Sequence, residues 1–242
     1  MHQLRIVTIR FNKPIKGHEI PAFRGAMARK VGLQHEWFHN HNNETKGYHY
    51  RYPRIQYKRH RGKPMLVCIE NGIEEVQKYF SKPDWHLEFS GEVHKMGIEE
   101  LRVHQFDIQV MEKMNTYRIK NWIALNNKNH KAFQNGSPIE QLQILERSLA
   151  GHIISFTKGI EFRPDKRFEV KIDSFPETRP VKLKGMTTLG FNLTFKTDLF
   201  LPNFIGLGKA VSKGYGVVMQ ERRNRRKPVV IENDIENFKK EL

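Results

Sequence analysis

The order of the predicted secondary-structure elements is the feature that most constrains the fold of this chain. Residues 3–11 alternate polar and apolar side chains, as a strand does, and a helix with apolar residues at steps of four is predicted from Pro21. Two strands flank Gly62, and a short helix follows the second of them. Further strands are expected at residues 85–90 and 101–111. The succession strand, helix, hairpin, helix, strand is typical of a ferredoxin-like domain.

The same succession begins again in the second half of the chain. A strand at 116–125 precedes a helix that starts at Ser137–Pro138 and carries apolar residues on one stripe. Further strands are predicted at residues 167–175, 181–198 and 217–222. The order of elements repeats although the sequence does not. We therefore predict an α+β fold of two tandem ferredoxin-like (RRM-like) domains, comprising residues 1–112 and 113–242.

The charge balance restricts the partners of the protein. The 242 residues include 42 Lys and Arg but only 26 Asp and Glu, which gives a net charge of +16. Such an excess favours a polyanionic partner, most commonly a nucleic acid, with an acidic membrane surface or no specific partner as alternatives. Cys68 is the single cysteine, so no internal disulfide can form, which fits a reducing cytoplasm. The sequence contains neither a signal-peptide core nor an apolar run long enough to cross a membrane.

Histidines are concentrated before the first hairpin, and two of them are suited to acid–base chemistry. His39 and His41 are two residues apart, so in an extended segment both side chains project to the same side. One imidazole can remove the proton of a ribose 2′-hydroxyl while the other protonates the leaving 5′-oxygen. This reaction leaves a 2′,3′-cyclic phosphate and a 5′-hydroxyl. A metal site is the alternative, but zinc requires three or four ligands, and no Cys or Glu stands at a matching spacing. Contact with phosphate without catalysis is the other alternative.

Residues 48–63 interleave aromatic and cationic side chains. Tyrosines can stack on bases while the cations follow the phosphate backbone, so we expect RNA contacts here. The candidate cations are Arg51, Arg54, Arg59 and Arg61. The alternative is a strand that packs some of its tyrosines into the core.

Residues 205–223 form a glycine-rich segment with interspersed lysines. Glycine permits positive φ and close approach of a ligand to the main chain, and exposed amides beside lysines can bind phosphates. The residues concerned are Gly206, Gly208, Lys209, Lys213, Gly214 and Gly216, followed by Arg222 and Arg223. The Walker pattern is absent. On composition alone, a simple glycine-rich turn is as good an interpretation as phosphate binding.

Together these segments resemble the Cas-six family of CRISPR-associated endoribonucleases. The resemblance rests on PAFRGAMARKV, the His-x-His loop at 39–41, YPRIQYK at 52–58, GKPMLVCIENG, and GLGKAVSKGYGVV at 206–218. It implies a cofactor-free, metal-independent cut within a CRISPR repeat transcript, yielding guide RNAs. His39 and His41 would catalyse the cut, and Lys58 or Tyr52 would stabilise the phosphorane. CRISPR repeat RNA is the expected partner, and a CRISPR effector complex and a homodimer are the further assemblies considered. A catalytically inactive RNA-binding subunit of such a complex is the alternative.

Overall fold

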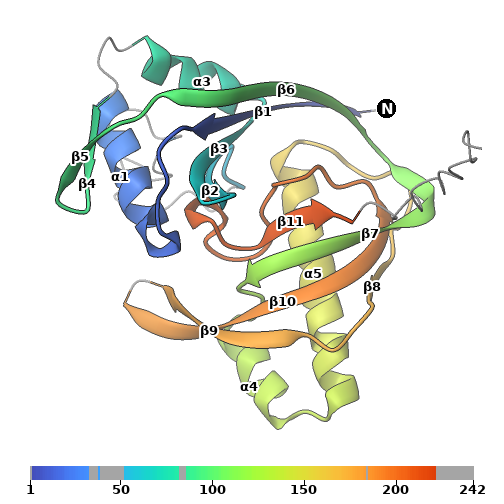
Figure 1. Ribbon diagram of the computed structural model, residues 1–242. Helices are drawn as coiled ribbons and strands as arrows, with labels where there is room; N and C mark the ends of the chain where they lie inside the picture. The colour runs from blue at the N-terminus through green and yellow to red at the C-terminus, as the bar shows by residue number, and fades with distance from the viewer. Residues whose placement is uncertain (1, 33–37, 39–51, 82–85, 184, 222–242) are drawn as a thin grey trace, which may run out of the picture.

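The computed structural model describes residues 2–32, 38, 52–81, 86–183 and 185–221, and these form two sheet-and-helix halves (Figure 1). The first half contains a four-stranded antiparallel sheet of order β2-β3-β1-β6. Its strands are β1 His2–Phe11, β2 Ile55–His60, β3 Lys63–Ile69 and β6 Ile98–Ile108. Its helices are α1 Ile20–Val31, preceded by the short 3-10 turn η1 Gly17–Glu19, and α3 Asn71–Phe80. The first and third strands lie in the centre, as the ferredoxin-like arrangement requires.

The predicted hairpin is confirmed, and the backbone conformation of its turn explains why a glycine stands at position 62. Arg61 and Gly62 connect β2 to β3, and both have positive φ, at 49° and 83°. Two-residue turns with both central residues at positive φ match the twist of the flanking strands, which is why glycine is favoured there. The strand predicted at 85–90 is β4 His86–Phe89, which pairs with β5 Glu92–Lys95 in a small separate sheet.

Both faces of the first sheet are buried, each against a different layer. Ile9 and Phe11 of β1 belong to a core cluster with Phe23 of α1. Leu4 and Ile6, which alternate with them, belong to the cluster that contains the interior of the second half. The first sheet therefore lies between its own helices and the second half of the molecule. Alternation along β1 places the two apolar sets on opposite faces.

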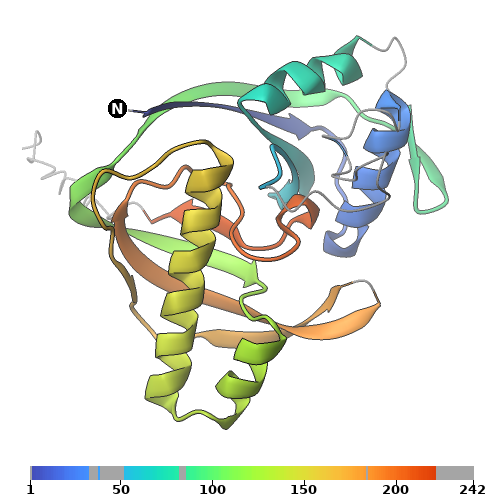
Figure 2. The same cartoon turned by 180° about the vertical axis from the view of Figure 1, so that it is seen from behind.

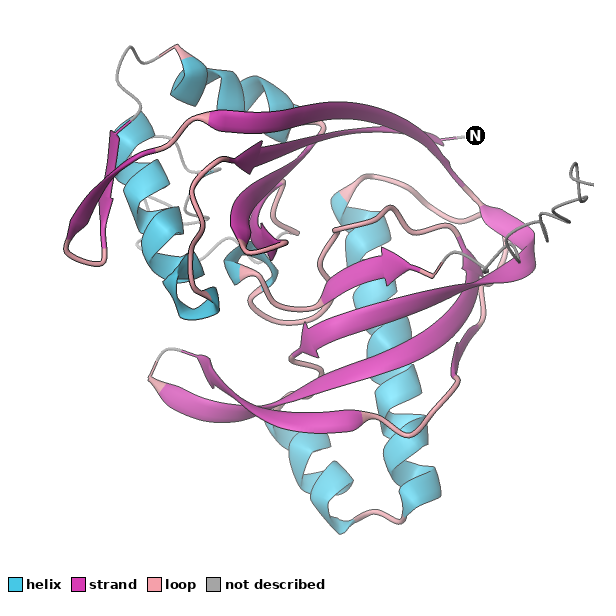
Figure 3. Ribbon diagram, in the orientation of Figure 1, coloured by secondary structure: helices cyan, strands magenta, loops and turns pink. Residues whose placement is uncertain are grey.

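The second half repeats this arrangement, except that a loop stands in place of the second helix. Its sheet has the order β11-β7-β10-β8, with β9 pairing along the other end of β10. The strands are β7 Val110–Trp122, β8 Val170–Ile172, β9 Glu177–Leu183, β10 Met186–Leu199 and β11 Val217–Gln220, and the helices are α4 Asn127–Asn135 and α5 Pro138–Gly159. The helices cover one face of this sheet (Figure 2). Between β10 and β11 the chain is loop apart from the 3-10 turn η2 Val211–Lys213 (Figure 3). The glycine-rich segment thus occupies the place of the second helix.

This architecture confirms the predicted α+β class with two tandem ferredoxin-like halves, and it differs from the prediction in detail. Helix α5 begins as expected, because the Ser137 hydroxyl accepts from the Glu140 amide and the Glu140 carboxylate accepts from the Ser137 amide. Ile139, expected on its apolar stripe, is 70% exposed, whereas Leu145, Leu149 and Ile153 of the same stripe are buried. Gln109 alone separates β6 from β7, slightly before the boundary expected at 112. No helix in the described part of the chain is long and apolar enough to cross a membrane.

Candidate active site

Three polar side chains of the segment leading through β2 hold the glycine-rich loop. The Tyr52 hydroxyl donates to the Gly206 carbonyl at 2.9 Å, and the Gly206 amide donates to Gln56 Oε1 at 3.0 Å. Lys58 Nζ donates to the Val211 carbonyl at 3.0 Å. All three side chains are buried, and alternation along the strand directs Gln56 and Lys58 to the same face. The loop is therefore fixed to β2 by hydrogen bonds to its main chain.

Lys58 is buried without a carboxylate partner among the described residues. Its exposure is 0%, and loss of hydration lowers its pKa from 10.5 to about 7. Burial likewise raises the pKa of Tyr52. A phosphate reaches neither side chain while the loop is in this position. To stabilise a phosphorane, Lys58 or Tyr52 would have to be accessible to the phosphate, and neither side chain is accessible here. That role therefore stays a prediction.

The glycines of the loop are explained by packing. A Cβ on Gly206 would lie 2.6 Å from Lys58 Nζ and 2.4 Å from Val211 Cγ1. Gly216 has φ +62°, and a Cβ there would lie 1.8 Å from the Leu207 carbonyl oxygen. Gly208 and Gly214 also have positive φ, and each lies against backbone atoms of the chain. Phosphate binding by these four glycines stays a prediction, because close contacts within the protein already account for them.

The predicted RNA-binding cations divide into engaged and available groups. Arg54 pairs with Glu161 at 3.0 Å, and Arg59 Nε donates to the Ile15 carbonyl at 2.6 Å. Arg61, at the turn of the hairpin, and Lys209, in the loop, are exposed. The half-buried Lys213 already has an interaction within the protein. Arg51, Arg222 and Arg223 lie outside the described residues. Arg61 and Lys209 are therefore the cations best placed to meet a phosphate.

The predicted catalytic residues His39 and His41 also lie outside the described residues, but the residue before them is described. Phe38 is buried at 1% exposure, and its carbonyl accepts from the Tyr57 hydroxyl at 3.3 Å. The carbonyl oxygen of Tyr57 lies 3.3 Å from the position of a Cβ on Gly214. Tyr57 thus contacts both the start of the histidine segment and the glycine-rich loop. The sequence pattern includes Tyr57 only among the tyrosines of residues 48–63 that are expected to stack on bases.

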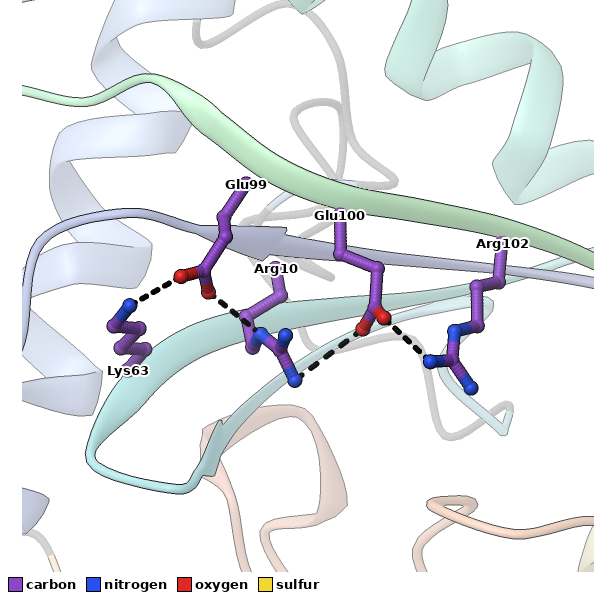
Figure 4. Close-up of polar contacts among 5 residues, drawn as sticks. All are labelled: Arg10, Lys63, Glu99, Glu100 and Arg102. Atoms are coloured by element: carbon purple, nitrogen blue, oxygen red, sulfur yellow. Dashed lines mark hydrogen bonds and ion pairs between the residues drawn. The ribbon is translucent and has the colours of Figure 1, made fainter.

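Lys63 and Arg10, near the hairpin tip, belong to a network of ion pairs with acidic residues of β6. Lys63 and Arg10 both bind Glu99, with an Arg10–Glu99 distance of 2.8 Å (Figure 4). Arg10 also approaches Glu100 at 3.3 Å, and Glu100 binds Arg102. The network neutralises part of the positive charge near the tip. Among the described residues, Arg61 takes no part in these ion pairs.

Burial lowers the pKa of two histidines near the loop. His60 packs edge-on against Phe204, with ring centroids 4.9 Å apart, and burial together with the Arg61 and Arg10 charges lowers its pKa. His152 of α5 accepts a hydrogen bond from Trp122 Nε1 at 3.2 Å. Burial, with a smaller effect of Lys209, lowers the pKa of His152 to about 4. Because an unprotonated nitrogen accepts this bond, His152 is neutral at physiological pH.

Comparison with known families identifies both halves of the chain. A model of the Cas6b N-terminal domain matches residues 2–107, and a model of the Cas6b C-terminal domain matches residues 109–221. The chain belongs to the Cas6b family. The contacts of Tyr52, Gln56 and Lys58 with the glycine-rich loop therefore join the two Cas6b domains.

Two Cas6b crystal structures resemble most of this chain, and a further protein matches about half of it. A crystal structure of a Cas6b protein superposes with a TM-score of 0.82 at 28% identity, covering 91% of this chain and 100% of that chain. A second, described as a CRISPR RNA processing endoribonuclease, superposes with a TM-score of 0.70 at 25% identity and the same coverage. An uncharacterized protein of Methanocaldococcus jannaschii is 31% identical over 137 residues, which cover 55% of this chain and 91% of that protein.

Proposed function

We propose that this Cas6b-family protein is a metal-independent endoribonuclease that cuts CRISPR repeat transcripts into guide RNAs. The observation that carries the proposal is the match of both halves to Cas6b domains, together with the whole-chain likeness to a solved CRISPR RNA processing endoribonuclease. The net charge of +16 suits an RNA substrate. The position of Tyr57 between Phe38 and the glycine-rich loop supports a site at this junction.

The proposed reaction needs only groups that the chain supplies. One of His39 and His41 accepts the proton of the ribose 2′-hydroxyl, whose oxygen attacks the adjacent phosphorus. The other imidazole donates a proton to the departing 5′-oxygen, so the products are a 2′,3′-cyclic phosphate and a 5′-hydroxyl. Arg61 and Lys209 are exposed cations that can neutralise charge on the phosphate. Lys58 and Tyr52 support this arrangement by holding the loop.

The test uses an end-labelled repeat RNA with mapped product ends. His39→Ala and His41→Ala are each expected to slow cleavage by about 100-fold or more while RNA binding is retained. His130→Ala, which alters a histidine of helix α4, is the matched control and should cleave at the wild-type rate. Cleavage should also persist in EDTA and stop when the ribose at the cut carries no 2′-hydroxyl.

Three results contradict the proposal. Loss of cleavage in EDTA with recovery on adding a divalent metal would refute the metal-independent mechanism. Tight, repeat-specific binding by the wild-type protein without any product would identify an inactive RNA-binding subunit of an effector complex instead. Equal affinity for repeat and scrambled RNA, measured at the same salt concentration, would leave only a basic protein without a specific partner.

A further inference from the structure

A cavity of about 450 Å³ lies where the two halves meet, and the proposed reaction does not use it. Its walls come from three places: His2 at the start of β1, Gln109 between β6 and β7, and residues 161–165, which follow α5. In both views the chain leaving α5 runs toward the N-terminal end of β1 (Figures 1 and 2). A volume of this size falls within the range of small-ligand pockets.

One wall of the cavity is aromatic. The rings of His2 and Phe162 lie with centroids 5.4 Å apart and planes inclined by 36°. Both side chains are half-buried, so each keeps ring surface open. Partly open His and Phe rings are the surfaces on which proteins stack unpaired RNA bases.

Three of the polar side chains around these rings are unengaged within the described part of the chain. Within the described part of the chain, the side chains of Gln109, Arg163 and Asp165 make no hydrogen bond or ion pair, and all three are exposed. Glu161 is held by Arg54, which is buried, through one carboxylate oxygen at 3.0 Å. The second oxygen of Glu161 remains available. The cavity therefore presents donors and acceptors together, beside an aromatic wall.

We infer that this cavity, named here the junction pocket, binds one unpaired purine base of the RNA, with guanine the best chemical match. Guanine offers N–H donors on its Watson–Crick edge, which a carboxylate such as Asp165 accepts. Its O6 and N7 accept from a guanidinium such as Arg163. Stacking on Phe162 completes the contacts. The inference rests on the proposed function, since it assigns a subsite for the same RNA.

Two observations favour RNA over a peptide as the occupant. The segment beside the pocket continues with the exposed Lys166 and Arg167, which suit a phosphate backbone. The pocket is also linked to the candidate active site by a short stretch of chain. Tyr52 contacts the glycine-rich loop, and Arg54, two residues on, contacts the wall of the pocket through Glu161. Two residues of chain span at most roughly 7 Å, so these two contacts lie near one another.

The test measures binding and cleavage of the repeat RNA separately. Phe162→Ala should weaken RNA binding about tenfold, as expected for loss of one stacked base, and Asp165→Asn should weaken it several-fold. Single-turnover cleavage of saturating bound RNA should remain within about twofold of wild type for both variants. Phe175→Ala removes an aromatic side chain that is 59% exposed outside the pocket and should change neither quantity.

A second measurement locates the base. The repeat RNA is prepared with 6-thioguanosine at one guanosine at a time, bound to the wild-type protein and irradiated. We expect one position to cross-link to the peptide containing Phe162, and replacement of that guanosine by adenosine should weaken binding to wild type but not to Asp165→Asn. Asp165 is exposed, so this variant tests the inference even if Phe162→Ala folds poorly.

The results separate this inference from the proposed function. Wild-type affinity in both variants, or cross-links confined to other segments while the repeat is still cleaved, would overturn the junction pocket and leave the ribonuclease intact. Absence of cleavage by the wild-type protein would instead overturn the proposed function.

Discussion

Lys58 gives the sharpest quantitative prediction, because a lysine buried without a carboxylate costs stability when it is charged. Its exposure is 0%, and burial lowers its pKa from 10.5 to about 7. The unfolded chain therefore holds the proton more tightly than the folded protein does. Between pH 7 and pH 10.5 the unfolded state binds more protons, so the free energy of unfolding rises with pH across this window. Below pH 7 the full penalty is present.

The size of the effect follows from the two pKa values. Their difference, at 1.36 kcal/mol per pH unit, gives a penalty of roughly 5 kcal/mol at pH 6, which falls to about 2 kcal/mol at pH 9. Lys58→Met keeps the length of the side chain and removes the charge. It removes one of two donors to the Val211 carbonyl, which still accepts from the Gly214 amide at 3.3 Å, so the lost hydrogen bond costs about 0.5–1.5 kcal/mol. The variant should therefore be more stable than wild type at pH 6 and lose about 3 kcal/mol of that advantage by pH 9.

Urea unfolding of both proteins at pH 6, 7, 8 and 9 measures this change. The difference between variant and wild type is the informative quantity, because other titrating groups contribute equally to both. Lys171→Met, which removes an exposed lysine, is the control and should keep a constant difference from wild type. A difference between Lys58→Met and wild type that does not vary with pH would refute the claim that Lys58 is buried against the loop.

Three further outcomes follow from the same region. Gly216→Ala should destabilise the fold by at least about 3 kcal/mol in urea unfolding, because its φ is +62° and a backbone oxygen lies 1.8 Å from the new Cβ. Gly17→Ala is the control, since its new Cβ meets nothing within 4 Å, and it should not change the stability. Tyr57→Phe removes the hydrogen bond to Phe38 and should slow single-turnover cleavage while the Kd for RNA stays within about twofold of wild type; an unchanged rate would contradict its positioning role. In an NMR titration, His152 should remain neutral down to about pH 4, and a midpoint near 6.5 would contradict its burial beside Trp122.

The elements with strong local signals were predictable from the sequence. Alternation along residues 3–11, the glycine of the hairpin turn and the Ser-Pro start of α5 each specify their structure within a few residues. Helix α4 was missed, because its sequence NKNHKAFQN contains one buried apolar residue, Phe133, and its cap is a single asparagine. Its formation depends on packing against α5, which a local pattern does not reveal.

The candidate site was harder to predict, because its contacts join residues about 150 positions apart. The YPRIQYK strand and the glycine-rich segment were both recognised, yet nothing in either shows that Gln56 and Lys58 meet the main chain at Gly206 and Val211. The sequence predicts that Lys58 stabilises the phosphorane. Its burial against the loop is not visible in the local pattern, because burial depends on the whole fold. The alternation of β2 does contain a usable signal, since it predicts that Gln56 and Lys58 share one face.

The two faces of β2 explain how segments far apart in the sequence can form one site. On one face, Gln56 and Lys58 bind the glycine-rich loop of the second domain. On the other, the side chain of Tyr57 binds the carbonyl of Phe38, immediately before the histidine segment. Three consecutive residues of one strand therefore hold the glycine-rich loop on one face of the strand and the Phe38 carbonyl on the other.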